Sequence, residues 1–323
     1  MSAEGITSSA AQRTIASPPP PAAAPAADAA AAALPAATAA AAAPIANAMT
    51  CDVEDYFQVQ AFFGVVRRDD WDRLPRRVAD NTSRVLDIYA EHGVKATFFT
   101  LGWVAERHPA LIRRIVSEGH ELASHGWAHF RADEQTPDEF REDVRRTKLL
   151  LEDVGGTEVT GYRAASFSIG QRNIWAFSIL GEEGYRYSSS VYPVKHDIYG
   201  MPDAPRFPFR PQDGGGLAEF PVTTIDLAGR KLPCGGGGYF RLLPYAVSRT
   251  AMRRVNRRDR MPCVFYFHPW EIDPGQPRIA GASAKSRFRH YTNLSRFEDK
   301  LRRALGDFAW TRMDRVLETY GPV

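Results

Sequence analysis

Two histidines four residues apart, His125 and His129, form the pair in this sequence whose spacing most suggests chemistry. They directly follow Ser124, where a short apolar run ends. On a helical turn, side chains at this spacing point the same way, so both imidazoles could bind one metal ion. Such a pair can also be incidental. The metal interpretation therefore needs an acidic ligand from elsewhere in the chain.

A cluster of acidic residues could provide that ligand. Asp52, Glu54 and Asp55 directly follow the apolar residues 49–51. Carboxylates crowded at a strand end repel one another, and a metal ion or a proton would relieve the repulsion. An acidic, solvated turn would explain the same residues. Taken with the two histidines, the cluster favours a site of two histidines and one carboxylate with an open coordination position.

Two more polar residues follow apolar runs. His268 comes after the apolar residues 264–267, and Arg163 comes before a loop of small residues. A lone histidine in such a strand is more often a satisfied core residue, but at the same sheet edge it could transfer a proton. Arg163 could hold a catalytic carboxylate ionised and oriented, or it could cap a helix. The residues alone leave both alternatives open.

The segments around these residues alternate between short apolar runs and amphipathic stretches. Helices are predicted at 82–92, at 109–119 and from Thr136-Pro137 onward. This alternation is typical of an α/β fold with a parallel sheet, and the polar residues after several strands favour an irregular barrel with its site at one rim. The predicted strands are 46–53, 96–101, 121–124, 159–163, 185–191, 218–225 and 263–267.

Composition excludes several classes of protein. The 323 residues are 44% hydrophobic and 24% charged, which suits a globular enzyme. The net charge of +3 comes with scattered basic pairs, so we expect no nucleic-acid partner. Cys51, Cys234 and Cys263 form no CxxC pair, so we expect reduced, buried thiols.

Residues 1–47 are dominated by alanine and proline. Proline blocks a continuous helix and alanine alone cannot form a core, so this N-terminal arm is predicted to be disordered. The arm lacks the basic start and the Leu/Val-rich run of a signal peptide, and no later run reaches the length of a membrane span. We therefore expect a cytoplasmic protein with no transmembrane segment. Residues 48–323 are predicted to form one domain, including a C-terminal extension from about residue 277.

Together these segments resemble the polysaccharide deacetylase family with the NodB homology domain, also called carbohydrate esterase family 4. The closest resemblance is to a branch found with exopolysaccharide and exosortase gene clusters. The combination is specific, although each piece alone is weak. The matching stretches are 52–58 (DVEDYFQ), 96–101 (ATFFTL), 119–129 (GHELASHGWAH), 161–169, 236–245 (GGGYFRLLPY), 265–270 and 290–294 (HYTNL).

The resemblance implies a distorted (β/α) barrel and one divalent metal ion, usually zinc. It implies removal of N-acetyl groups from amino sugars of a bacterial polysaccharide or its precursor, with an N-acetylated polysaccharide or oligosaccharide as the partner. Carried over by position, His125 and His129 become metal ligands. Asp52 becomes the general base, Arg163 its partner and His268 the general acid.

The second carboxylate of the site is less directly matched. Many relatives have two adjacent aspartates, whereas Val53 follows Asp52 here. Residues 52 and 54 face the same side of an extended segment, so Glu54 is the predicted metal ligand, with Asp55 in reserve. Aromatic residues that could stack on sugar rings, or could equally belong to the core, are Tyr56, Trp127, Tyr239 and Trp270.

The chain departs from this family at two positions. Ala165 stands where relatives often have proline, which should mainly loosen a loop. Ser188 stands where relatives often have an aspartate that could orient Arg163 or tune His268. A neighbouring acid such as Asp197 could replace that carboxylate. Two other functions therefore stay open: a metal amidohydrolase of a small ureide or cyclic amide, and a degenerate glycan-binding module.

Overall fold

The computed structural model describes residues 44–196, 200–212 and 214–322. The described chain from residue 44 onward belongs to one compact unit. Nearly all of the predicted arm, residues 1–43 of 1–47, lies outside the described residues, and so does Asp197. The disorder predicted for the arm therefore stays a prediction.

The strands of the described residues form one large sheet and one hairpin. The sheet has the order β10-β1-β2-β3-β4-β5-β6, β9 also pairs with β1, and every pairing in it is parallel. In the hairpin, β7 and β8 pair antiparallel. The strands are β1 (Asn47–Val53), β2 (Thr97–Thr100), β3 (Glu121–Ser124), β4 (Gly161–Tyr162), β5 (Tyr187–Ser188), β6 (Ala218–Glu219), β7 (Thr224–Leu227), β8 (Arg230–Pro233), β9 (Val264–Phe267) and β10 (Trp310–Thr311).

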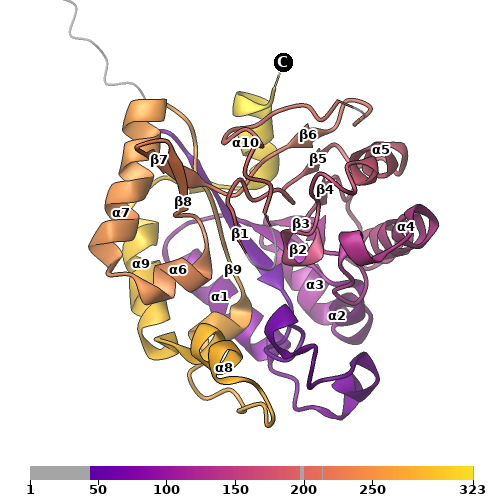
Figure 1. Cartoon of the computed structure of the whole chain (residues 1–323). Coiled ribbons are helices and arrows are strands. Elements are labelled where there is room, and N and C mark those ends of the chain that lie inside the picture. Colours follow the sequence, from indigo (N-terminus) through magenta and orange to yellow (C-terminus); the bar gives the residue numbers. More distant parts are fainter. Residues whose placement is uncertain (1–43, 197–199, 213, 323) are drawn as a thin grey trace, which may run out of the picture. The chain divides into compact units, whose positions relative to one another are not determined.

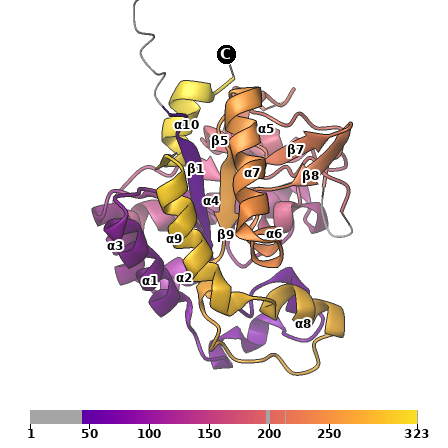
Figure 2. The same cartoon turned by 90° about the vertical axis from the view of Figure 1, so that its left-hand side faces the viewer.

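Helices flank this sheet on its outside (Figure 1). Helices α2 to α5 lie along the part formed by β2 to β5, whereas α7 and α9 run alongside β1 and β9 (Figure 2). The predicted α/β barrel is therefore confirmed as a parallel sheet that curls into half a barrel. The helices are α1 (Val78–Glu91), α2 (Gly102–Arg107), α3 (Pro109–Ser117), α4 (Pro137–Gly155), α5 (Trp175–Glu182), α6 (Gly237–Leu242), α7 (Tyr245–Arg254), α8 (Ala284–Tyr291), α9 (Phe297–Asp307) and α10 (Met313–Tyr320).

Local chemistry explains where several helices start. Helix α4 begins after Thr136, whose hydroxyl accepts the N–H of Glu139 while the Glu139 carboxylate accepts the N–H of Thr136. This capping box satisfies two backbone donors that a helix start leaves unpaired. Pro109 begins α3, where its missing N–H costs nothing. The predicted starts of both helices are confirmed.

One predicted strand is wrong. The sequence predicts a continuous strand at 218–225, but β6 ends at Glu219 and β7 begins at Thr224 in the separate hairpin. Between them, the N–H groups of Phe220 and Val222 still donate to the carbonyls of Ser188 and Val191. Pro221 has no N–H to donate on the opposite side, where Glu219 bonds to Phe209, so no regular ladder extends there.

Two glycines bring the chain after β8 against the free side of β9. The N–H of Tyr266 donates to the carbonyl of Gly235, and Gly236 forms a parallel bridge to Tyr266. A Cβ on Gly235 would lie 2.3 Å from the carbonyl oxygen of Val264, and one on Gly236 would lie 2.7 Å from the Tyr266 ring. Only glycine permits this close approach.

The C-terminal segment is part of the sheet and of the core. Beyond residue 277, predicted to be an extension, β10 pairs with β1, and Met313 and Val316 of α10 are buried. The three cysteines are free and buried, as predicted. Within the described residues, no helix combines the length and the apolar character needed to cross a membrane. The expected cytoplasmic location stays a prediction.

Candidate functional site

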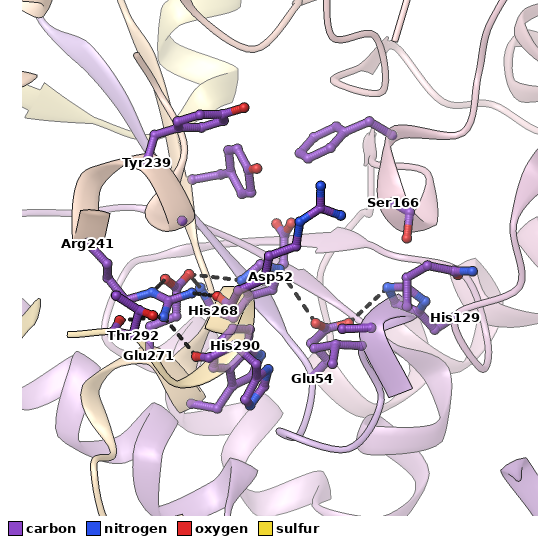
Figure 3. A pocket seen from close by; sticks show the side chains of 18 of the residues that line it. Asp52, Glu54, His129, Ser166, Tyr239, Arg241, His268, Glu271, His290 and Thr292 are labelled. Carbon is purple, nitrogen blue, oxygen red and sulfur yellow. Dashed lines mark hydrogen bonds and ion pairs between the residues drawn. The ribbon is translucent and has the colours of Figure 1, made fainter. Parts of the chain in front are cut away.

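A cavity of about 380 Å³ lies where several parallel strands end at their carboxyl side. Asp52, Glu54, His125, His129 and His268 all line it. The first two lie at the end of β1, the next two follow β3, and His268 follows β9. Figure 3 shows Glu54 between His129 and His268.

Glu54, His125 and His129 form a compact cluster, with one possible ligand atom from each lying within 4.8 Å of the others. Nε2 of His129 lies 3.0 Å from Oε2 of Glu54. Glu54 is 1% exposed, yet among the described residues neither of its carboxylate oxygens accepts a hydrogen bond. Burial alone would raise the pKa of Glu54, but His129 and His268 outweigh burial and lower it. An ionised, buried carboxylate aimed at two imidazoles fits a bound cation.

The protonation of His125 also suits a ligand. Its Nδ1 lies 2.8 Å from the carbonyl oxygen of Arg163, which can only accept a hydrogen bond. Nδ1 therefore holds the proton, and the lone pair is on Nε2. Burial lowers the pKa of His125 to about 4, against the opposing effect of Asp52, so the ring is neutral near pH 7.

Asp55 is not part of this cluster. Its carboxylate accepts the backbone N–H groups of Tyr56, Arg77 and Val78, at the beginning of α1. The side chain is fully buried, and burial raises its pKa to about 6 although these N–H groups oppose the rise. The structure thus places Glu54 with the histidines and gives Asp55 a helix-capping position.

Asp52 and Arg163 form a buried ion pair. Nη1 of Arg163 lies 2.6 Å from Oδ1 of Asp52 and also donates to the hydroxyl of Thr50. Nε and Nη2 donate to the carbonyl and the hydroxyl of Ser189, and the guanidinium lies 4.0 Å from the centre of the Phe99 ring. With these contacts Arg163 can hardly move, so it fixes one oxygen of Asp52.

His268 has a carboxylate partner that the sequence interpretation missed. Nδ1 of His268 lies 3.0 Å from Oε1 of Glu271, which also accepts the backbone N–H of His268. Nε of Arg241 donates to the other oxygen of Glu271 at 2.6 Å. Burial would lower the pKa of His268, but Glu54 and Glu271 outweigh it and raise that pKa to about 9. His268 is therefore a cation near pH 7.

The spacing of His268 and Glu271 contained a usable indication. A polar residue before Pro269, with a glutamate three positions later, has the form of a capping box, and the structure contains one there. Arg241 has no such local indication. It reaches Glu271 from α6 across 30 positions of sequence.

Ser188 does not have the role that its position in the sequence suggested. Its hydroxyl donates to Ser190, and it pairs in register with Glu219 of β6. Glu219 accepts the N–H groups of Ser190 and Val191, and burial raises its pKa to about 7 despite these bonds. The carboxylate beside His268 comes from Glu271, so the idea that Ser188 deprives His268 of its partner needs correction.

The aromatic residues predicted to contact sugar separate into two groups. Trp127 lies outside the cavity that contains the cluster, because its ring is packed between Gly102 and the guanidinium of Arg146, 3.4 Å from the ring centre. Its prediction as a stacking residue is corrected. Tyr56 is fully buried in the core.

Trp270 and Tyr239 do line the cavity. The Trp270 ring is stacked between His268 at 5.0 Å and His290 at 4.1 Å between centroids, so its faces are covered. Trp270 therefore supports the orientation of His268. Tyr239 is only partly buried and remains the predicted stacking residue.

Two family models match the chain. The model described as "Polysaccharide deacetylase" matches residues 69–186, and the model described as "Domain of unknown function (DUF3473)" matches residues 189–318. The first contains both histidines of the cluster, and the second contains His268 and Glu271.

Curated proteins match over shorter stretches. The peptidoglycan-N-acetylglucosamine deacetylase of Bacillus cereus is 37% identical over 75 residues, which is 23% of this chain and 27% of that protein. The chitooligosaccharide deacetylase of Sinorhizobium fredii is 54% identical over 48 residues, which is 15% of this chain and 22% of that protein. The chain thus matches about a quarter of the length of these relatives.

A solved structure matches over nearly its whole length. It is a Mycobacterium smegmatis protein described as a polysaccharide deacetylase, with a TM-score of 0.54 and 22% identity, and the match covers 86% of this chain and 94% of that one. At this identity the likeness concerns the fold.

Proposed function

Because the chain belongs to the polysaccharide deacetylase family, we propose that it is a metal-dependent hydrolase that removes N-acetyl groups from amino sugars of a bacterial polysaccharide or its precursor. One observation supports this above all. A single cavity combines a cluster of two histidines and one glutamate, a carboxylate held by arginine, and a cationic histidine. Two relatives are named as deacetylases of peptidoglycan N-acetylglucosamine and of chitooligosaccharides, so an N-acetylhexosamine is the first substrate to test.

Glu54, His125 and His129 would hold the metal ion. Two imidazole nitrogens and one carboxylate oxygen form a donor set typical of catalytic zinc, and three protein ligands leave a position open. The buried carboxylate oxygens of Glu54, which accept no hydrogen bond among the described residues, fit a cation. When bound, such an ion supplies a Lewis acid that polarises an amide carbonyl and favours deprotonation of water.

Asp52 would act as the general base. Arg163 binds one oxygen of Asp52 and keeps the carboxylate fixed at the cavity wall. An amide needs an activated water to be attacked at neutral pH, and a positioned carboxylate can accept the proton that this water loses.

His268 lies across Glu54 from His129 and would act as the general acid. As an imidazolium it can donate a proton from Nε2 to the departing sugar amine. Glu271 holds Nδ1, which fixes the ring and favours its cationic form, and Arg241 in turn holds Glu271. Without this proton the amine would be expelled as an unfavourable anion.

The experiment that tests the proposal is acetate release from N-acetylglucosamine oligomers by the purified chain, measured with zinc and after chelation. We expect release with zinc and its loss on chelation. Glycan binding without turnover would instead favour a binding module. Ring opening of a small cyclic amide without acetate release would favour an amidohydrolase.

A further inference from the structure

The loop that contains both histidines of the cluster has an unusual backbone at its end. His129 has a φ of +53°, in the left-handed region that few non-glycine residues adopt. A side chain on such a backbone points differently from one on an ordinary extended or helical backbone. The direction of Nε2 of His129 toward Glu54 therefore depends on what holds this conformation.

Arg68 contacts this part of the loop with two donors. Its Nε donates to the carbonyl of Ala128 at 2.8 Å, and its Nη2 donates to the carbonyl of His129 at 3.0 Å. The guanidinium lies over two aromatic rings, 4.8 Å from the centre of Phe63 and 4.1 Å from that of Phe130. The side chain is thus held on its faces and on its donor edge.

Other groups hold the earlier part of the loop. The N–H of Trp127 donates to Oδ1 of Asp143, and its carbonyl accepts the N–H of Trp103. The carbonyl of Gly126 accepts the N–H of Gly102. These contacts fix the first residues after His125, whereas Arg68 binds the carbonyls at the His129 end.

We propose that Arg68 is a positioning residue for the metal centre, which keeps the backbone of His129 in the conformation that directs its imidazole toward Glu54. This inference rests on the proposed metal-dependent function. The contact needs a planar group with two parallel donors, and a lysine ammonium cannot reproduce that geometry. Arg68 acts through the backbone and does not itself touch the cluster.

The charge of Arg68 and its proposed positioning role predict opposite changes in zinc affinity when the side chain is removed. A guanidinium close to a cation site repels the ion, so removing its charge should by itself strengthen metal binding. If Arg68 positions His129, its removal should weaken metal binding despite that change in charge. A loss of affinity therefore identifies the positioning role.

The test measures zinc affinity, without reference to turnover, by competition with a chromophoric chelator on the full chain. We expect Arg68→Ala to raise the zinc dissociation constant by about 10- to 100-fold, as is typical for groups that orient metal ligands. Arg68→Lys, whose ammonium can still donate to one of the two carbonyls although not to both in the same geometry, should weaken zinc binding by a smaller factor. Excess zinc should restore occupancy in both variants.

Two arginines offer matched controls. Arg67 precedes Arg68 in the chain, is exposed and pairs only with Asp69 among the contacts the structure describes, so Arg67→Ala should leave zinc affinity unchanged. Arg107 resembles Arg68 in lying over an aromatic ring, 4.2 Å from the centre of Trp103, but it binds Asp72. Arg107→Ala should lower the melting temperature of the zinc-free protein without changing its zinc affinity.

The possible results distinguish a failure of the Arg68 proposal from a failure of the proposed metal-dependent function. Wild-type affinity in Arg68→Ala, or an equal loss in Arg107→Ala, would overturn the proposed role of Arg68. If Arg68→Ala does not fold, Arg68→Lys decides the matter, and unchanged affinity there overturns it. A wild-type chain that binds no zinc would instead contradict the metal-dependent function itself.

Discussion

The cavity has a metal side, formed by Glu54, His125 and His129, and an acid side, formed by His268, Glu271 and Arg241. The two sides differ in how their polar atoms are paired. On the metal side, Glu54 and His129 have buried polar atoms without hydrogen-bond partners among the described residues. On the acid side, His268, Glu271 and Arg241 form a continuous chain of hydrogen bonds and ion pairs. Glu54, His129, Glu271 and Arg241 are buried, whereas the side chain of His268 is 20% exposed.

This difference shows what each side lacks. The oxygens of Glu54 lie 3.0 Å from His129 and 3.5 Å from His268 but accept no hydrogen bond among the described residues, so the metal side fits a cation that is not part of the chain. On the acid side, Glu271 and Arg241 already pair with His268 and with each other, although Glu54 of the metal side also raises the pKa of His268. Substitutions on the metal side should therefore change occupancy, whereas those on the acid side should change the pH profile.

The largest effect is expected on the metal side. His125→Ala removes one of three ligands, so zinc content should fall sharply. Acetate release should fall by about 10⁴-fold, because a Lewis acid contributes several kcal/mol to the barrier. Metal analysis and turnover measure the two effects, with the exposed His92→Ala as control. Full zinc occupancy in His125→Ala would contradict the cluster assignment.

A substitution of the base should separate turnover from occupancy. Asp52→Asn keeps the size of the side chain but cannot accept a proton, so turnover should fall by about 10²- to 10⁴-fold. Zinc content should stay normal, because Asp52 is outside the three-residue cluster. Near-normal acetate release under conditions where chemistry limits the rate would exclude Asp52 as the base.

On the acid side the expected change is in the pH dependence. His268 must be protonated to act, so activity is present below its pKa of about 9 and is lost as the pH rises through it. Glu271→Gln removes a carboxylate that favours the cation, so the alkaline limb should move about one unit lower. Turnover against pH at full zinc occupancy measures this. An unmoved limb would show that Glu271 does not influence the acid.

The smallest effect on catalysis is expected at Ser188. Because Glu271 is the partner of His268, Ser188→Asp should leave the alkaline limb in place. It should instead lower stability by about 1–3 kcal/mol, since it adds a buried carboxyl opposite Glu219. Turnover profiles and denaturant unfolding measure both effects, with Ser188→Asn as the uncharged control. Activity of Ser188→Asp that extends to higher pH than that of the wild type would show that a carboxylate at position 188 tunes His268.

The stability effect at Ser188 should itself depend on pH. The pKa of Glu219 is about 7 in the folded protein, above its ordinary value of 4.5. Between these values the folded state holds a proton that the unfolded state has released, so stability falls as the pH rises from about 4.5 to 7. A second carboxyl beside it should make that fall steeper.

Features set by local chemistry were predictable from the sequence. The starts of α3 and α4 depend on Pro109 and on the capping box of Thr136, and both lie within one helical turn. The two histidines do lie together, but the predicted helical turn is wrong, because His125 and His129 lie in a loop in which His129 has a φ of +53°. The alternation of strands and helices predicted the parallel sheet, because each segment's periodicity reflects which of its faces is buried.

The sequence by itself was therefore enough to predict the fold class and to identify the two histidines and the polar residues at the strand ends as candidate site residues. Only the tertiary structure placed Glu54, and not Asp55, beside the two histidines, because the beginning of α1 binds the carboxylate of Asp55. It also brought Arg241 to Glu271, the partner of His268, and placed Trp127 outside the cavity. The contacts of Asp55 with α1 and of Arg241 with Glu271 join segments that lie far apart in the chain, and such contacts leave no periodic pattern in the sequence.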